Sequence, residues 1–351
     1  MAASQAPLAI PRYYRTGDAY LECLLCPRHC RIPPGGTSSC LVRQNSSGAM
    51  RIPYYGYITA LAVDPMEKKP LYHFRPGEQI LSLGFAGCNL HCPFCQNWRI
   101  SQTTEVRGDY MSPKDIIHAA TSAGVRQIAY TYSEPSVHIE FLLDCMEAAR
   151  AAGLANVLVS NGCIEGDAAA EVLALTDAAN IDLKCFSADT YTNMLGGSLE
   201  AVLSFLQLCQ KMGVHLEATT LVVPGLNDSP EELLSCAAFL AGLSPDIPWH
   251  LSAYHPDYRW DAPPTNPAAL FSAARQAAET LRYVYLGNIP AAYPADDSTP
   301  LTPGFHDTRC HACMAYLVRR RGYSIDTAGL KHGTERYCRC AQCGAAVPIV
   351  S

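Results

Sequence analysis

Residues 80–97, ILSLGFAGCNLHCPFCQN, are the stretch from which we infer the fold and the chemistry of this chain. An apolar run of strand length is followed by a loop that holds Cys88, Cys92 and Cys95, and no fourth cysteine follows nearby. Three thiolates spaced C-x3-C-x2-C can ligate three irons of a cubane, which leaves a [4Fe–4S] cluster one thiolate short of its usual four. The pattern therefore predicts a cluster with one open iron, where a substrate or cofactor can bind.

A zinc knuckle and reduced core cysteines are the two alternatives for this loop. Three cysteines within eight residues, directly after a strand, argue against ordinary core packing. Phe94 precedes the last cysteine and is suited to shielding a cluster from water.

The composition is that of an ordered globular protein. The chain has 351 residues, of which 49% are hydrophobic and 17% are charged, enough for one large domain and one or two small ones. The formal net charge of −6 gives no general attraction to nucleic acid, so a nucleic-acid partner is not indicated.

The 17 cysteines indicate a reducing compartment. Many of them form C-x2-C and C-x3-C groups, which favours metal-bound thiolates over disulfides in a chain of this length. Residues 1–11 are too short and too interrupted by proline for a secretory signal, and no stretch approaches a membrane span. We therefore expect a cytoplasmic protein with no membrane partner.

Residues 1–79 form a cysteine-rich N-terminal segment, with short strands that lead into the first barrel strand. Four cysteines separated by turn-forming prolines and glycines lie within eighteen residues of it: Cys23, Cys26, Cys30 and Cys40. Zinc and an auxiliary iron–sulfur cluster both suit this tetrathiolate set. A metal that orders a loop-rich N-terminus is the favoured interpretation, and the sequence does not choose the metal.

Residues 80–304 alternate between short apolar strands and amphipathic helices. Strands are expected near 80–87, 126–132, 155–160, 179–184, 214–222, 248–254 and 282–287. Helices are expected near 113–123, 136–152, 166–176, 198–212, 230–242 and 267–280, with start signals at Ser112-Pro113 and Ser229-Pro230. This order predicts an α/β fold, a partial or complete parallel βα (TIM-like) barrel, whose chemistry lies at the C-terminal ends of the strands.

Polar residues follow the predicted strands at the ends where a barrel would carry its site. They are Tyr130–Pro135, Ser160–Gly162, Asp182–Lys184, Thr219-Thr220, Pro224–Asp228 and His250–Pro256. We expect these groups to form one constellation with the three cysteines of the loop.

Residues 305–351 form a separate C-terminal module. Cys310 and Cys313 make one C-x2-C pair and Cys340 and Cys343 another, a pattern that suits a tetrahedral zinc ribbon. Rubredoxin-like iron and a cluster are the alternatives, and Cys338 is a spare thiol. The Arg319–Arg321 run is interpreted as a solvated charged strand rather than an anion or RNA contact.

Across residues 80–255 the sequence resembles radical S-adenosylmethionine (SAM) enzymes of the pyruvate formate-lyase-activating-enzyme type. Over its full length it is similar to the radical SAM component of the AmmeMemoRadiSam system. The motifs that carry the second likeness are CxxCPRxC at 23–30, Cys88–Trp98, YTYSEP at 130–135, DLK at 182–184, PWH at 248–250, LGNIP at 286–290 and the C-terminal cysteine pairs.

The resemblance implies roles for five further residues. Glu134 corresponds to the contact for the SAM amino group, a role that suits a carboxylate, although it is also placed to cap a helix. Asn161 corresponds to a position near the methionyl or ribose part of SAM, and Asp182 and Lys184 to further SAM contacts. Lys184 as a solvated strand-end charge is the alternative. His255 corresponds to a histidine near the adenosine, whereas His250 and His73 are interpreted as structural.

The activity implied by the resemblance is reductive cleavage of SAM, followed by hydrogen abstraction from a substrate that the sequence does not identify. The implied cofactors are a [4Fe–4S] cluster and SAM, and the implied electron donor is a flavodoxin- or ferredoxin-like protein. The substrate class is open: a small molecule, a macromolecular residue or a partner protein. An activase that installs a glycyl radical on a partner enzyme is the first alternative, and a non-catalytic metal-stapled binding protein is the second.

Overall fold

The centre of the molecule is an open eight-stranded sheet, seen in a computed structural model that describes residues 9–103, 106–289, 305–333 and 335–351. Its order is β15-β14-β13-β12-β11-β10-β8-β7, and all neighbours are parallel except β7 and β8. The parallel strands are β8 (Gln79–Gly84), β10 (Gln127–Thr131), β11 (Ala155–Ser160), β12 (Ala178–Asp182), β13 (His215–Val222), β14 (Trp249–Ala253) and β15 (Val284–Gly287). The predicted α/β barrel is confirmed in its partial form, with β7 (Ala60–Pro65) and β15 as edges.

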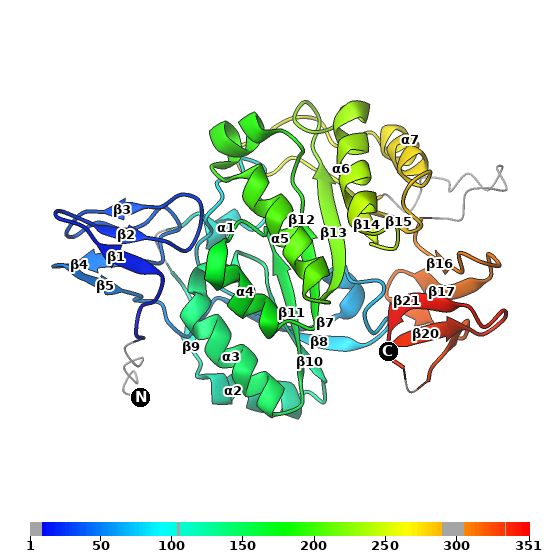
Figure 1. Cartoon of the computed structure of the whole chain (residues 1–351), viewed down its shortest axis with the longest axis horizontal. Coiled ribbons are helices and arrows are strands. Elements are labelled where there is room, and N and C mark those ends of the chain that lie inside the picture. The colour runs from blue at the N-terminus through cyan, green and yellow to red at the C-terminus, as the bar shows by residue number, and fades with distance from the viewer. Residues whose placement is uncertain (1–8, 104–105, 290–304, 334) are drawn as a thin grey trace.

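Helices connect the parallel strands and lie against the sheet (Figure 1). They are α1 (Trp98–Ser101), α2 (Pro113–Ser122), α3 (Ile139–Ala151), α4 (Gly166–Ala174), α5 (Leu199–Lys211), α6 (Pro230–Leu243) and α7 (Pro267–Ala277). The predicted start signals are confirmed, because Ser112 forms a capping box with Asp115 and the Ser229 side chain accepts from the backbone N–H of Glu232. None of the helices in the described ranges is long and apolar enough to span a membrane.

The main core lies between these helices and the sheet. Strand β10 is buried along its whole length, as expected for a parallel strand covered on both faces. Trp249 of β14 is fully buried, and its indole N–H donates to the hydroxyl of Thr220 at 3.0 Å. The core therefore fixes the strands whose C-terminal ends carry the site.

The N-terminal segment lies at one end of the molecule (Figure 1). A small sheet of β1 (Tyr14–Thr16), β2 (Leu21–Cys23) and β3 (Arg31–Ile32) is followed by the hairpin β4 (Gln44–Ser46) and β5 (Ala49–Arg51). Strand β6 (Tyr57–Ile58) pairs with β9 (Asp109–Tyr110), which ties this segment to the loop before α2.

The C-terminal module lies at the opposite end and consists of two three-stranded sheets (Figure 1). Their strands are β16 (Thr308–Arg309), β17 (Tyr316–Arg321), β18 (Ser324–Asp326), β19 (Leu330–Lys331), β20 (Tyr337–Cys340) and β21 (Ala346–Val350). Val350 exchanges backbone hydrogen bonds of 2.8 Å with His73 and Arg75, directly before β8. The module is thus docked on the barrel, and the domain boundaries at 79/80 and 304/305 remain predictions.

The prediction of a solvated Arg319–Arg321 strand is wrong at its central residue. Arg319 and Arg321 are exposed, but Arg320 is buried between the module and the barrel. The period of two in β17 turns one arginine inward while its neighbours face solvent.

Candidate active site

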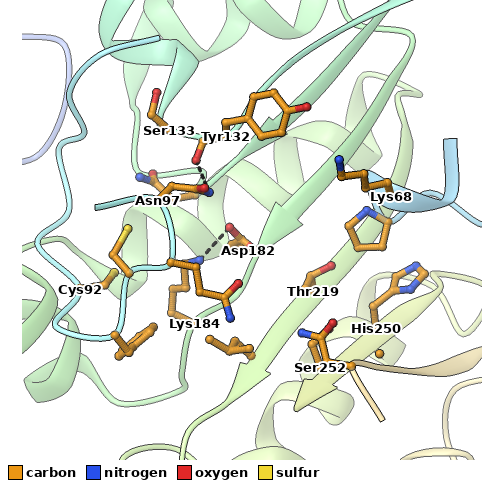
Figure 2. A pocket seen from close by; sticks show the side chains of 18 of the residues that line it. Lys68, Cys92, Asn97, Tyr132, Ser133, Asp182, Lys184, Thr219, His250 and Ser252 are labelled. Atoms are coloured by element: carbon orange, nitrogen blue, oxygen red, sulfur yellow. Dashed lines mark hydrogen bonds and ion pairs between the residues drawn. The ribbon is translucent and has the colours of Figure 1, made fainter. Parts of the chain in front are cut away.

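A pocket of about 500 Å³ opens at the C-terminal ends of the parallel strands. The three loop cysteines line it together with Glu134, Asn161, Asp182 and Lys184. In Figure 2, Cys92 and Lys184 lie on one side of the pocket, and Lys68 and His250 lie on the other. The predicted constellation of strand-end residues is therefore present except for Pro224–Asp228, which is not among the described residues that line the pocket; its Asn227 amide instead donates to the backbone carbonyls of Lys184 and Leu221. The volume lies in the range of about 300–1,000 Å³ that is usual for ligand sites.

The cysteine loop between β8 and α1 directs sulfur atoms and polar donors toward the same space. The Cys88 sulfur accepts from the backbone N–H of Leu90 at 3.3 Å and from the Asn161 amide at 3.6 Å. The Cys95 sulfur lies 3.3 Å from the Ser101 hydroxyl. Such donors stabilise thiolate ligands, so the loop fits a cluster.

Burial alone disfavours the thiolate forms of Cys88 and Cys92, as it does for the core cysteine Cys209. Burial raises the pKa of Cys92 to about 12 and the pKa of Cys88 well above its ordinary value. Both would stay protonated without a cation, whereas iron coordination removes the proton and neutralises the charge.

Glu134 joins the ends of two neighbouring strands. Its carboxylate, 1% exposed, accepts from the backbone N–H groups of Ser136 at 3.0 Å and Asn161 at 2.8 Å, and from the Ser160 hydroxyl at 2.8 Å. Burial raises the pKa of Glu134, although these hydrogen bonds oppose the shift. The capping contact to Ser136 and the position at the pocket are therefore both present.

Asp182 and Lys184, at the end of β12, form an ion pair with an N···O distance of 2.7 Å. Burial favours the neutral amine, but Asp182 and the Cys92 sulfur outweigh burial and raise the pKa of Lys184. The alternative of a solvated lysine is wrong, because the Lys184 side chain is 18% exposed and its ammonium group is paired with Asp182 at the pocket wall.

The histidines divide between core and surface. His250 is buried and hydrogen-bonded to Glu217 at 2.7 Å, which confirms its structural interpretation, although it also lines the pocket. His73 is fully buried, with Tyr285 as a partner at 2.7 Å. His255 is exposed and is not among the described residues that line the pocket, although its Nε2 lies 3.1 Å from the amide of the pocket residue Gln96. Its SAM role stays a prediction.

Some pocket residues come from the two terminal segments and are not predicted by the sequence pattern. Lys68 and Tyr72 belong to the chain before β8, and Gly322 and Tyr323 belong to the β17–β18 hairpin of the C-terminal module. No spacing pattern connects them with the cysteine loop, because they reach the pocket through tertiary packing.

Tyr132, which belongs to the predicted Tyr130–Pro135 group, has a backbone conformation that the sequence does not reveal. It has a φ of +70°, which is uncommon for a residue with a side chain. Its hydroxyl donates to Asp64 at 2.5 Å and its carbonyl accepts from Asn97 at 2.6 Å, so a strained turn connects β10 with the cysteine loop.

The C-terminal cysteine pairs converge on one point. Cys310 and Cys343 have sulfurs 3.7 Å apart, as do Cys313 and Cys340. All four ligand atoms lie within 4.8 Å of one another, and Cys338 is outside the group. Burial opposes thiolate formation at Cys340, but backbone N–H groups of Gln342 and Cys343 lower its pKa to about 7. The site fits a single tetrahedral metal ion.

Comparison with known proteins agrees with this site. The family model of the radical SAM superfamily matches residues 83–237. The chain is 38% identical over 345 residues to the uncharacterized protein MJ0808 of Methanocaldococcus jannaschii, which covers 96% of this chain and 98% of that protein. The chain therefore belongs to the radical SAM superfamily, in one family with that archaeal protein.

More distant similarities cover part of the chain. The 7-carboxy-7-deazaguanine synthase of Thermococcus kodakarensis is 26% identical over 188 residues, 48% of this chain and 73% of that enzyme. The pyruvate formate-lyase-activating enzyme of Clostridium pasteurianum is 24% identical over 177 residues, 49% of this chain and 73% of that enzyme. A solved structure of TYW1 with a lysine–pyruvate adduct has 17% identity, covers 64% of this chain and 85% of that chain, and gives a TM-score of 0.46.

Proposed function

We propose that this protein is an enzyme that reductively cleaves SAM and abstracts a hydrogen atom from a substrate held in the same pocket. A [4Fe–4S] cluster on Cys88, Cys92 and Cys95 would supply the electron that converts SAM to methionine and a 5′-deoxyadenosyl radical. The observation that carries the proposal is that these thiols share one pocket with Glu134, Asn161, Asp182 and Lys184.

The residues of the chain have separable tasks in this proposal. Glu134 and Asp182 present carboxylate oxygens to the amine and hydroxyls of SAM, and their own hydrogen bonds hold them in position. Thr219, His250 and Ser252 line the opposite side of the pocket, where a substrate would meet the radical. Tyr323 also lines the pocket, so the C-terminal module would contribute to substrate choice.

The experiment is anaerobic reconstitution, reduction and measurement of 5′-deoxyadenosine. The wild-type protein should form it, and the C88A/C92A/C95A variant should form none while it retains the C-terminal metal. Equal 5′-deoxyadenosine formation by both proteins would refute the assignment. Activity should be lost in air, and a flavodoxin- or ferredoxin-type protein should replace the chemical reductant.

Installation of a glycyl radical on a partner enzyme is a second candidate, supported by the similarity to pyruvate formate-lyase-activating enzymes. The motifs at 23–30, 130–135 and 182–184 also support assignment to the AmmeMemoRadiSam system. The genes next to this one in the genome distinguish the two candidates, because an activase requires a gene for a glycyl radical enzyme. A glycyl radical signal on such a partner after incubation with SAM would establish the activase.

The C-terminal site is proposed to bind zinc, because its sulfur spacing of 3.7 Å agrees with the roughly 3.8 Å expected for tetrahedral Zn–S bonds of about 2.3 Å. A cytoplasmic location is proposed from the cysteine usage.

A further inference from the structure

The four cysteines of the N-terminal segment are brought together by a hairpin and a turn. Cys23 donates its backbone N–H to the carbonyl of Cys30 at 3.0 Å across the β2–β3 hairpin, and Cys26 lies in the connecting loop. Cys40 lies in a second turn, where the Ser38 hydroxyl is 3.2 Å from its sulfur. All four are free thiols, and only Cys30 is more than slightly exposed. This segment thus collects four unpaired thiols that the catalytic pocket does not use.

The N-terminal four cysteines do not form a compact single-ion site like the one in the C-terminal module. Among the described residues, the C-terminal four are the only group of three or more Cys, His, Asp or Glu side chains with all ligand atoms within 4.8 Å of one another. Neither the N-terminal four nor Cys88, Cys92 and Cys95 form such a group. Thiolates on a cubane stand farther apart than those on one ion, because irons and sulfides lie between them.

One nitrogen of a buried arginine near these thiols lacks a hydrogen-bond acceptor in the described part of the chain. The Arg43 side chain is fully buried and donates to both carboxylate oxygens of Glu140, at 2.9 and 3.0 Å, and to the Arg12 carbonyl at 2.8 Å. Within the described residues its Nε has no hydrogen-bond partner. Arg43 interacts electrostatically with the thiols of Cys23 and Cys40. A thiolate or sulfide would supply the acceptor that a buried guanidinium requires.

The segment also packs directly on the catalytic loop. Arg28 Nε donates to the Asn89 carbonyl at 2.9 Å, and the Ser39 hydroxyl lies 2.7 Å from His91 Nε2. Gly87 has a φ of +83°, and a Cβ added there would come within 2.2 Å of the Cys40 carbonyl oxygen. The four thiols are thus part of the structure that supports the catalytic cysteines.

We propose that Cys23, Cys26, Cys30 and Cys40 bind a second [4Fe–4S] cluster instead of zinc. The cluster accepts one electron from dithionite, passing from the 2+ to the 1+ state, with no bond made or broken in the protein. A fully loaded chain thus holds two redox-active clusters and one C-terminal single-ion site.

The test uses the full-length C88A/C92A/C95A variant, which leaves the N-terminal segment unchanged. After anaerobic reconstitution, about four irons and four sulfides per chain should remain, with one C-terminal zinc and an electron paramagnetic resonance signal after reduction. A chain with two zinc ions and no iron would overturn the proposal, and so would a chain with an empty N-terminal site.

A single further substitution shows where the remaining iron is bound. In the same background, Cys30→Ser replaces the most exposed of the four thiols and should change the spectrum or lower the iron content. The matched control is Cys209→Ala, a buried cysteine of α5 outside every group, which should change neither. Identical iron content and spectra in the C30S and C209A proteins would place the iron elsewhere.

Discussion

Arg320→Met should detach the C-terminal module from the barrel. The Arg320 side chain is 2% exposed, and its guanidinium donates to the Tyr72 carbonyl at 2.7 Å and lies 4.1 Å from the centre of the Tyr72 ring. It also donates to the His306 carbonyl at 3.1 Å and the Thr308 hydroxyl at 2.8 Å. Methionine keeps much of the side-chain volume but removes the charge and every donor.

The expected cost follows from leaving these groups without their cation. Removal of one member of a buried charged network costs about 3–5 kcal/mol. Burial raises the pKa of Glu67, whose carboxylate lies 3.9 Å from Arg320, and loss of that cation lets Glu67 take up a proton. Protonation offsets part of the cost, so we expect about 3 kcal/mol, or roughly 100-fold in the docking equilibrium.

Thermal unfolding is the assay, with Arg321→Met as the matched control. Arg321 is the exposed neighbour on the same strand, and its substitution should cost less than about 0.5 kcal/mol. The R320M protein should melt roughly 5–10 °C below wild type and expose the 305–351 segment to protease. Equal melting temperatures for the two variants would refute the idea that Arg320 holds the module in place.

Three other predictions concern SAM, acid stability and zinc. Glu134→Gln and Asp182→Asn should each weaken SAM binding about tenfold or more without lowering the iron content of the cluster, because a charge-assisted hydrogen bond contributes about 1.5–3 kcal/mol. SAM affinity is measured by titration calorimetry, and wild-type affinity in both variants would assign the two residues a structural role. Burial lowers the pKa of His73 in the folded protein to about 3. As the pH falls below about 6.5, the His73 imidazole therefore takes up a proton in the unfolded chain but not in the folded one, which favours unfolding. Between pH 7.5 and pH 5, the free energy of unfolding measured in urea should therefore fall by about 2 kcal/mol more for wild type than for His73→Gln. Equal decreases for the two proteins would contradict a neutral buried His73. The C-terminal site should keep one zinc ion in air, and Cys343→Ser should release it and loosen residues 305–351; metal analysis that finds iron there would contradict the zinc assignment.

The sequence alone determined those features that depend on residues close together in the chain. The spacing of Cys88, Cys92 and Cys95 specifies a ligand loop because one short turn holds all three. The alternation of strands and helices specifies a parallel sheet, and that sheet brings Glu134, Asn161 and Asp182 to one edge. Capping signals such as Ser112 act within a single helical turn, so they too can be identified from sequence.

Only the tertiary structure decided what depends on contacts between distant segments. Arg320 is indistinguishable in sequence from Arg319 and Arg321, and its burial follows from the face that β17 turns toward the barrel. Tyr323 reaches the pocket because β21 docks beside residues 73–75. The sequence shows that four cysteines lie between residues 23 and 40. It does not show how they are arranged in space or that their segment packs on the catalytic loop. Such contacts are set by how preformed elements pack, and no local pattern records that packing.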